Sequence, residues 1–266
     1  MTPIARFSII DYLNALPLNL AFKDGLYRDR AELIFDFPSQ CADNLASGQA
    51  DVGLISSIEY QRIPGLIIAP HIAIASRKEV RSVLILTKKD LADVRLIALD
   101  RFSRSSVALL RLLLHRRYGS RPHFLSMTPD PKTMLHEADA ALIIGDAALA
   151  MPCGDYQVID LATEWYRETQ LPFVFAFWAM RSGTPVDELS AILLAAKKYG
   201  QEQLPHRLDE IRKRWDLPAE DILAYLTTNI HYDLEDDERA SLALFYRYAF
   251  EARLIDHVKE VRFAEG

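Results

Sequence analysis

Four short polar segments carry residue types that could hold a small anion. Each follows an apolar run and precedes a stretch with helical patterning. Ligands of α/β proteins bind beyond the carboxyl ends of strands, where the next helix offers free backbone N–H groups and the positive end of its dipole. Any one segment could be a plain helix cap, since Ser, Asn and Asp are preferred caps. Together they predict one shared cleft. Its candidate residues are Asn14, Ser56, Ser57, Ser103, Arg104, Ser105, Ser106, Gly145 and Asp146.

The segment from Ser103 to Ser106 is the strongest candidate for binding a carboxylate or a phosphate. It combines hydroxyl groups, backbone N–H groups and the guanidinium of Arg104 at one predicted helix start. Arg104 has an alternative interpretation as a solvated surface charge. The side-chain amide of Asn14 can both donate to a ligand and accept from it.

Three further polar residues each have two interpretations. Ser82 lies where a strand should begin, so its hydroxyl either faces a ligand or simply lies on the strand. Glu59 and Asp146 are candidate acid or base groups, but each could instead orient its neighbours or face water.

Several common catalytic motifs are missing from the sequence. It has no glycine-rich dinucleotide or nucleoside-triphosphate signature and no G-x-S-x-G nucleophile elbow. Its seven histidines include no H-x-x-x-H pair of the kind that binds zinc. We therefore expect neither a cofactor nor a metal.

Composition and charge narrow the class of partner. The 266 residues suffice for one or two domains with a sizeable core, and 50% of them are hydrophobic. A net charge of −6 with scattered Lys and Arg argues against binding nucleic acid, which needs a basic stripe. No run approaches the roughly 20 apolar residues of a membrane span. We therefore expect a small-molecule ligand and no membrane or nucleic-acid partner; the oligomeric state is left open.

The predicted location is the cytoplasm. The N-terminus lacks the uninterrupted apolar stretch of a signal peptide. Cys41 and Cys153 lie far apart without a paired-cysteine motif, which predicts no disulfide framework and fits a reducing compartment.

The elements that must position these residues are short strands and amphipathic helices. Their alternation up to about residue 180 predicts βα units with a mostly parallel sheet. The predicted strands are Ile4–Ile10, Glu32–Phe37, Val52–Ile55, Leu66–Ala75, Ser82–Thr87, Leu96–Leu99, His123–Ser126, Ala140–Ile144, Tyr156–Asp160 and Phe173–Met180. The predicted helices include Pro38–Ser47, Ser105–Tyr118 and a C-terminal set, Val186–Gln203, His206–Trp215, Ala219–Asn229 and Leu234–Phe250.

The pattern favours two connected lobes over two separate domains, because there is no internal repeat and no long Gly/Ser linker. Apolar runs near residues 66–87 and 173–180 suit two crossings between the lobes. The predicted first lobe comprises residues 1–86 and 178–266. Residues 87–177 form the second lobe, and the substrate cleft lies between the two.

The order of the polar motifs resembles that of one known family. The relevant segments include Tyr12-Leu13-Asn14-x-x-Pro17, Ser57-x-Glu59-Tyr60, Val80-x-Ser82-Val83, Leu99-Asp100-x-x-Ser103-Arg104-x-Ser106 and Ile144-Gly145-Asp146. Each is weak alone. In this order, over essentially the whole chain, they resemble the chorismate dehydratase family of the futalosine route to menaquinone.

The resemblance implies a fold like that of the type II periplasmic binding proteins, with two α/β lobes and the substrate between them. It also implies a hydro-lyase that converts chorismate to 3-[(1-carboxyvinyl)oxy]benzoate without a cofactor. In that elimination the carbon bearing the enolpyruvyl ether loses a proton, the neighbouring carbon loses hydroxide, and the ring becomes aromatic.

The resemblance points to Asn14 and Ser82 as catalytic residues that position the substrate and stabilise developing charge. Neither an amide nor an unactivated alcohol is a base at neutral pH. The expected proton acceptor is therefore the substrate's own enolpyruvyl carboxylate, with Glu59 and Asp146 as alternatives. The other candidate residues then bind the substrate.

The sequence departs from the family pattern at Lys78, Ala162 and Gln170, where glycine is usual. Two other functions stay open. One is a non-catalytic protein that binds a small anion on the same fold. The other is the related enzyme acting on cyclic dehypoxanthine futalosine, although its usual Ser-Pro-Cys-Pro-Asn segment is absent here.

Overall fold

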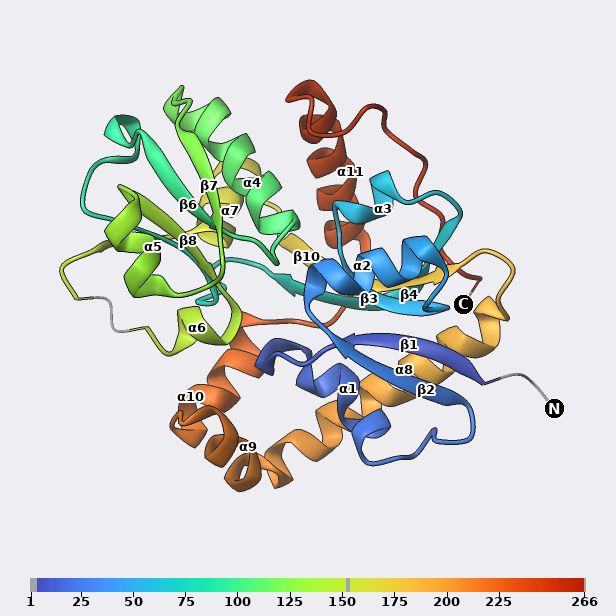
Figure 1. Ribbon diagram of the computed structural model, residues 1–266. Coiled ribbons are helices and arrows are strands. Elements are labelled where there is room, and N and C mark those ends of the chain that lie inside the picture. The colour runs from blue at the N-terminus through green and yellow to red at the C-terminus, as the bar shows by residue number, and fades with distance from the viewer. Residues whose placement is uncertain (1–3, 152–153, 266) are drawn as a thin grey trace.

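The computed structural model describes residues 4–151 and 154–265 and contains two five-stranded sheets (Figure 1). The first sheet comprises β1 (Ala5–Ile10), β2 (Ala31–Asp36), β3 (Val52–Ser56), β4 (Leu66–Ser76) and β10 (Phe173–Arg181), in the order β2-β1-β3-β10-β4. The second comprises β5 (Val83–Thr87), β6 (Leu96–Asp100), β7 (His123–Met127), β8 (Ala140–Ile144) and β9 (Gln157–Asp160), in the order β7-β6-β8-β5-β9. One strand of each sheet, β10 or β5, runs antiparallel to the other four. The predicted α/β class with mostly parallel sheets is confirmed.

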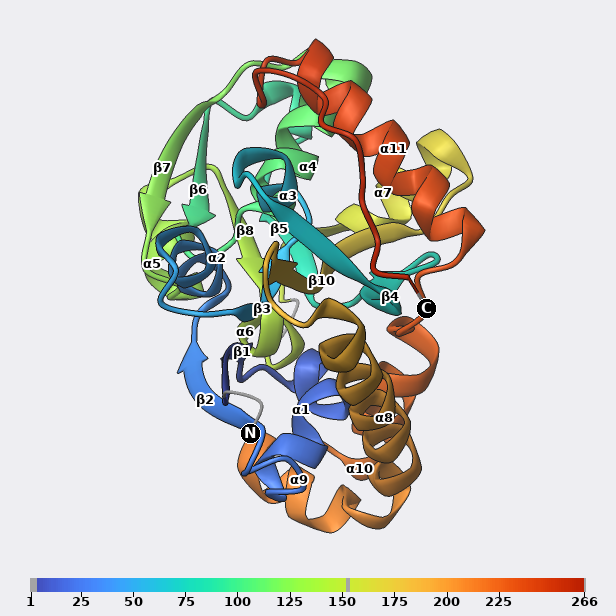
Figure 2. The ribbon, with the colours of Figure 1, turned by 90° about the vertical axis from the view of Figure 1, so that its right-hand side faces the viewer.

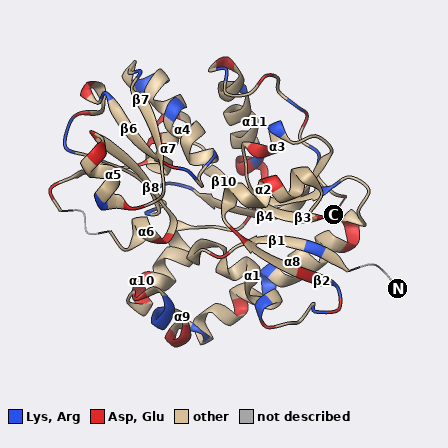
Figure 3. Cartoon of the chain, in the orientation of Figure 1, with Lys and Arg blue, Asp and Glu red and all other residues tan. Residues whose placement is uncertain are grey.

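Four of the strands are predominantly apolar. β3, β4, β5 and β8 contain no Lys, Arg, Asp or Glu, and charged residues lie mainly on helices and loops (Figure 3). All five residues of β8 are buried. Strands covered on both faces show such continuous apolar runs, which is why they could be located from the sequence.

The chain passes between the sheets twice, through residues 77–82 (the first crossing) and residues 161–172 (the second crossing). β5 therefore belongs to the second sheet and β10 to the first. The predicted lobe boundaries at 86/87 and 177/178 fall within these two strands, and the division into lobes at these residues stays a prediction. The apolar runs alone could not show which sheet each strand joins, because a strand reads the same in either sheet.

Helices cover both sheets. They are α1 (Leu16–Lys23), α2 (Pro38–Ser47), α3 (Glu59–Arg62), α4 (Ser105–Leu113), α5 (Pro131–Glu137), α6 (Gly145–Leu149), α7 (Leu161–Thr169), α8 (Val186–Gln203), α9 (Leu208–Trp215), α10 (Ala219–Ala224) and α11 (Asp236–Glu251). A 3₁₀ turn covers Leu13–Ala15, and π-helical turns extend α4 and α10 over Leu114–Tyr118 and Tyr225–Asn229. The predicted C-terminal helical segment is confirmed.

The C-terminal helices lie at both ends of the molecule. α8 runs alongside α1, while α11 lies at the opposite end and contacts α4 and β10 (Figures 1 and 2). Gly200 of α8 allows the close approach to α1, because a Cβ there would lie 1.8 Å from the carbonyl oxygen of Pro17. This packing supports the segment that carries Asn14, which immediately precedes α1.

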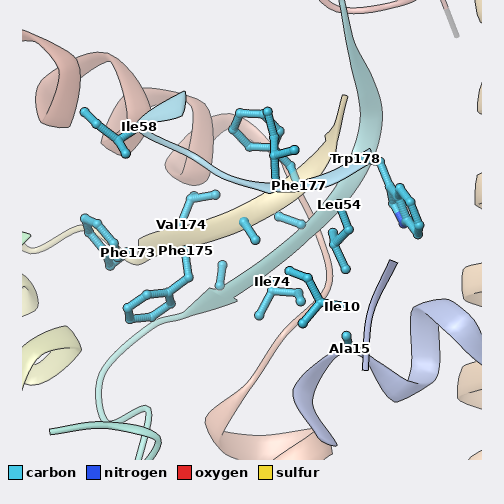
Figure 4. Packing of buried hydrophobic residues seen from close by; sticks show 14 of the residues in the cluster. Ile10, Ala15, Leu54, Ile58, Ile74, Phe173, Val174, Phe175, Phe177 and Trp178 are labelled. Atoms are coloured by element: carbon cyan, nitrogen blue, oxygen red, sulfur yellow. The ribbon is translucent and has the colours of Figure 1, made fainter. Parts of the chain in front are cut away.

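The main hydrophobic core extends through both sheets. β10 contributes Trp178, whose ring packs against Phe7 and Phe22 with centroids 6.1 Å and 6.3 Å away. Near the other end of β10, Ile74 of β4 lies next to Ile10 of β1 (Figure 4). The hydrophobic core therefore continues beneath the ends of the strands of the first sheet.

Two findings bear on the location of the protein. Of the helices that the structure describes, none has both the length and the apolar character needed to cross a membrane. Cys41 is a buried free thiol, and Cys153 lies outside the described residues.

Candidate active site

The carboxyl ends of strands from both sheets meet at one cavity. It contains about 530 Å³ of empty space including its open mouth. The centre of a water molecule can reach only about 60 Å³ of it, so the cleft is narrow in this structure. The sequence-predicted residues that line it are Asn14, Ser56, Ser82, Ser103, Ser105, Ser106 and Gly145.

The start of α4 forms one wall of the cavity. Ser103 and Ser106 are buried there, and Ser56 lies across from them at the end of β3. Within the described part of the chain, the hydroxyls of these three serines have no hydrogen-bond partner. The first backbone N–H groups of a helix also lack intrahelical partners. This wall therefore presents several neutral donors at the positive end of a helix dipole, which is an arrangement that binds carboxylates.

Ser105 also lines the cavity, but its hydroxyl is already engaged. It accepts a hydrogen bond from the backbone N–H of Ile58 at 3.1 Å and shares another with the Ser57 hydroxyl at 3.0 Å. These bonds join α4 of the second lobe to the end of β3 in the first. Ser105 therefore holds the two lobes in register beside the cavity.

The structure places Ser57 behind the wall, and its role as a substrate-binding residue stays a prediction. Ser57 does not line the cavity, and its hydroxyl donates to the carbonyl of Val174 at 2.7 Å. Its own carbonyl accepts from the hydroxyl of Tyr246 at 2.8 Å. It acts as a packing and hydrogen-bonding residue, because Ser56 and Ser57 point to different sides where β3 ends.

Arg104 also does not line the cavity, and its predicted role in binding a carboxylate of the substrate stays a prediction. Its guanidinium donates to Glu59 at 2.8 Å and to the two carboxylate oxygens of Asp43 at 2.8 Å and 3.0 Å. Glu59 in turn pairs with Arg62 at 2.7 Å. The charges that sequence reasoning assigned to the ligand are neutralised within the protein, between α4 on one side and α2 and α3 on the other.

Asp146 also has its carboxylate engaged within the protein, and its predicted role in binding the substrate stays a prediction. It does not line the cavity, and its two carboxylate oxygens accept from the backbone N–H of Leu13 at 2.9 Å and from the indole N–H of Trp215 at 2.7 Å. Burial raises its pKa, and these two hydrogen bonds partly oppose that rise. Asp146 thereby holds the turn next to Asn14.

Gly145 permits the close contact between that turn and the second lobe. It adopts φ +62°, and a Cβ would lie 3.0 Å from the ring of Tyr12. A side chain at this position would be strained and would push Tyr12, another residue of the cavity wall, out of place.

Asn14 and Ser82 both line the cavity, and each is anchored by a tyrosine that sequence reasoning missed. The hydroxyl of Tyr225 donates to Ser82 Oγ at 2.7 Å, and that of Tyr232 donates to the backbone carbonyl of Asn14 at 2.9 Å. Nothing in the spacing linked either tyrosine to residues so distant in the sequence.

The cavity wall carries no charged side chain among the residues described. The nearest carboxylate behind α4 is that of Asp100, which is 1% exposed. Its Oδ1 accepts from the backbone N–H of Phe102 at 2.8 Å, while its Oδ2 has no partner within residues 4–151 and 154–265. Burial raises the pKa of Asp100 to about 6.

No group of three His, Cys, Asp or Glu side chains is placed to hold a metal ion in the part of the chain that the structure describes.

The fold and the cleft define a protein of the periplasmic-binding-protein-like class. The periplasmic aliphatic sulphonate binding protein of Escherichia coli aligns with a TM-score of 0.67 at 18% identity, covering 100% of this chain and 95% of that one. A protein of Archaeoglobus fulgidus aligns with a TM-score of 0.75 at 16% identity, covering 94% and 98%. At these identities the likeness shows the fold alone, and the predicted two-lobed fold class is confirmed.

Within this class, the chain belongs to a family described as menaquinone biosynthesis, whose model matches residues 5–251. The chorismate dehydratase of Thermus thermophilus is 30% identical over 88% of this chain and 91% of the relative. The chorismate dehydratase of Campylobacter jejuni is 27% identical over 91% and 96%. These findings confirm the resemblance drawn from the motifs and place the chain in a family of enzymes.

Proposed function

We propose that this protein is a chorismate dehydratase, a hydro-lyase that converts chorismate to 3-[(1-carboxyvinyl)oxy]benzoate in menaquinone synthesis. One observation carries the proposal: the cleft brings Asn14 and Ser82 together with an uncharged wall of hydroxyl groups at the start of α4. The names of the relatives support the same substrate.

The start of α4 suits a carboxylate of chorismate. Ser103 and Ser106 supply hydroxyl donors, and the helix end supplies backbone N–H groups and a positive potential. Ser56 supplies a further hydroxyl from the first lobe. Chorismate carries two carboxylates, so donors from both lobes can hold it across the cleft.

Asn14 and Ser82 would act on the reacting carbons. The ring carbon bearing the enolpyruvyl ether gives up its proton, the released electron pair forms the last ring double bond, and the neighbouring C–O bond breaks. Hydroxyl and amide donors stabilise the negative charge that develops on the departing oxygen, which leaves as water after taking up a proton. Aromatisation of the ring drives the step.

The substrate's enolpyruvyl carboxylate is the proposed proton acceptor. Among the described residues that line the cavity, none is a base near neutral pH. The two alternatives are engaged elsewhere, since Glu59 pairs with Arg62 and Arg104, and Asp146 binds Leu13 and Trp215. This supports assistance by the substrate over catalysis by either carboxylate.

The division into two lobes that close on the substrate belongs to the same proposal. Closure would exclude water and bring donors from both sheets onto the ligand. We place the reaction in the cytoplasm, which the free thiol of Cys41 supports.

The direct test is incubation of the EDTA-treated protein with chorismate, followed by mass spectrometry and ultraviolet detection of the product. We expect an aromatic product lighter than chorismate by one water molecule, formed about 100-fold more slowly by the Ser82→Ala variant at the same enzyme concentration. Absence of product with the wild-type protein would reject the proposal.

A second candidate is a binding protein without catalysis, because the fold is shared with the sulphonate binding protein of Escherichia coli. It predicts that chorismate binds in calorimetry and is recovered unchanged. Turnover by the wild-type protein would reject this candidate.

A further inference from the structure

We propose that Tyr225 is a positioning residue for the dehydration, which holds the hydroxyl of Ser82 so that its proton points at the departing oxygen of the substrate. The inference rests on the proposed function and adds a residue from the C-terminal helical segment to the machinery of the cleft.

The hydrogen bond between the two hydroxyls has a definite direction. Tyr225 donates to Ser82 Oγ at 2.7 Å, and the side chains are only 2% and 1% exposed. A serine hydroxyl has one proton and two lone pairs. Because Tyr225 supplies the proton for one lone pair, the proton of Ser82 is free to be donated, and it has no acceptor within the described residues. Since Ser82 lies on the cavity wall, the bound ligand is the acceptor within reach.

The segment around Tyr225 contacts the parts of the cleft that the reaction needs. Tyr225 begins a π-helical turn, a feature that is often found at functional sites. The end of that turn, Asn229, donates to the carbonyl of Glu79 in the first crossing at 3.1 Å. His231 pairs with Ala75 at the end of β4, and Tyr232 binds the carbonyl of Asn14. Residues 225–232 therefore run along the first crossing from Ser82 to Asn14.

Tyr225 stays a hydrogen-bond donor throughout the neutral pH range. Burial and the nearby carboxylate of Asp146 raise the pKa of its hydroxyl, while hydrogen bonding to Ser82 and Asn14 and the charge of Arg81 oppose that rise only in part. A tyrosine that holds its proton this firmly orients and polarises Ser82 but does not transfer a proton itself. Its loss should therefore lower kcat by the same factor at every pH in this range.

The test is the Tyr225→Phe variant, which removes one oxygen atom and keeps the ring. We expect kcat for chorismate to fall about tenfold, as for loss of a buried hydrogen bond that acts in the transition state, with KM changed less than about twofold. In the Ser82→Ala background the same substitution should have no further effect on kcat, because Tyr225 acts through Ser82.

Tyr60→Phe is the matched control. Tyr60 is 1% exposed, and its hydroxyl donates to the carbonyl of Glu260 at 3.0 Å and accepts from the N–H of Arg262 at 2.9 Å, away from the cavity. The Tyr60→Phe variant should lose as much free energy of unfolding in urea as the Tyr225→Phe variant, and its kcat should equal that of the wild type. If Tyr225→Phe does not fold, a fluorotyrosine at position 225 replaces it. Its more acidic hydroxyl donates more strongly, so kcat should rise with KM unchanged.

The outcomes separate the two proposals. A wild-type protein that does not dehydrate chorismate overturns the proposed function and the role of Tyr225 with it. An active wild-type protein whose Tyr225→Phe variant matches Tyr60→Phe in kcat overturns the inference alone. The inference is also overturned if Tyr225→Phe lowers kcat by the same factor in the wild-type and Ser82→Ala backgrounds. An unchanged kcat with fluorotyrosine at position 225 overturns it too.

Discussion

The wall of the cleft and its rim use polar groups in opposite ways. The wall, defined by Ser56, Ser103 and Ser106, presents hydroxyls without protein partners. The charged rim, defined by Asp43, Glu59, Arg104 and Asp146, consists of groups whose hydrogen bonds are made within the protein. Neutral donors are thus kept for the ligand, and charges join the two lobes.

The rim also contains an aromatic contact between the lobes. Phe37 after β2 stacks on Phe102 after β6, with ring centroids 4.1 Å apart and planes inclined by 10°. Together with the ion pairs of Arg104, this stack joins the segment after β2 and helices α2 and α3 to the segment between β6 and α4. The comparison of the wall with the charged rim shows that a charged side chain near a cleft is not necessarily a group that binds an anion.

The largest effect is expected from the two proposed catalytic residues, which line the cavity outside that wall. Ser82→Ala and Asn14→Ala should each lower kcat about 100-fold or more, as for loss of a donor to developing charge, while KM changes only a few-fold. Steady-state kinetics with chorismate measure both constants. Near-wild-type kcat in either variant would remove that residue from catalysis.

The next effect concerns the carboxylate of Asp100 behind the wall. Its pKa of about 6 in the folded protein exceeds the ordinary value of 3.8, so the folded state holds the proton more tightly. Stability is therefore lost as the pH rises between these two values, and the full loss is present above about pH 6. Asp100→Asn should raise the free energy of unfolding by up to about 3 kcal/mol at neutral pH and much less at acidic pH. Urea unfolding at neutral and at acidic pH measures this difference. An increase in the free energy of unfolding that is the same at both pH values would contradict the prediction.

Substitution of Arg104 tests the ion pairs of the charged rim. Arg104→Met should destabilise the protein by about 1–3 kcal/mol, because it leaves the buried carboxylate of Glu59 with one partner fewer, and should raise KM by weakening the contact between lobes. Combining it with Glu59→Gln and Asp43→Asn should restore much of the lost stability and of the original KM. A raised KM that the neutral partners do not restore would mean that Arg104 binds the substrate directly.

Ser106→Ala is the matching change in the wall. It should raise KM about fivefold through loss of one hydrogen bond to a carboxylate, with little change in unfolding. Adding Glu59→Gln and Asp43→Asn should not restore the KM of the Ser106→Ala variant. An unchanged KM would take Ser106 out of the proposed carboxylate site.

The smallest effect is expected at Gln170, where the family has glycine. Gln170 ends α7 with φ +60°, the left-handed conformation that glycine adopts without strain. Its side chain partly compensates by donating to the carbonyl of Tyr166. Gln170→Gly should raise the free energy of unfolding by less than about 1 kcal/mol and leave kcat unchanged. A loss of stability would show that the side-chain contact outweighs the strain.

Much of the fold could be predicted because its strands are short, apolar and bounded by turns. β8 and β3 are buried on both faces, so their residue types alone mark them as strands. The π-helical turns were predicted only as ends of helices, since their hydrogen bonding has no local sequence signal. The sheet to which β5 and β10 belong could not be predicted, because which sheet a strand joins depends on pairings with distant strands.

The sequence by itself determined the polar strand ends, the helix start at Ser105 and hence the position of the cleft. Only the tertiary structure decided how the polar groups there are used. Arg104 and Asp146 find partners in the other lobe, and Tyr225 contacts Ser82, which lies 143 positions away in the sequence. Local spacing shows which residues share an element, but the partner of a charge or hydroxyl depends on which elements pack against it.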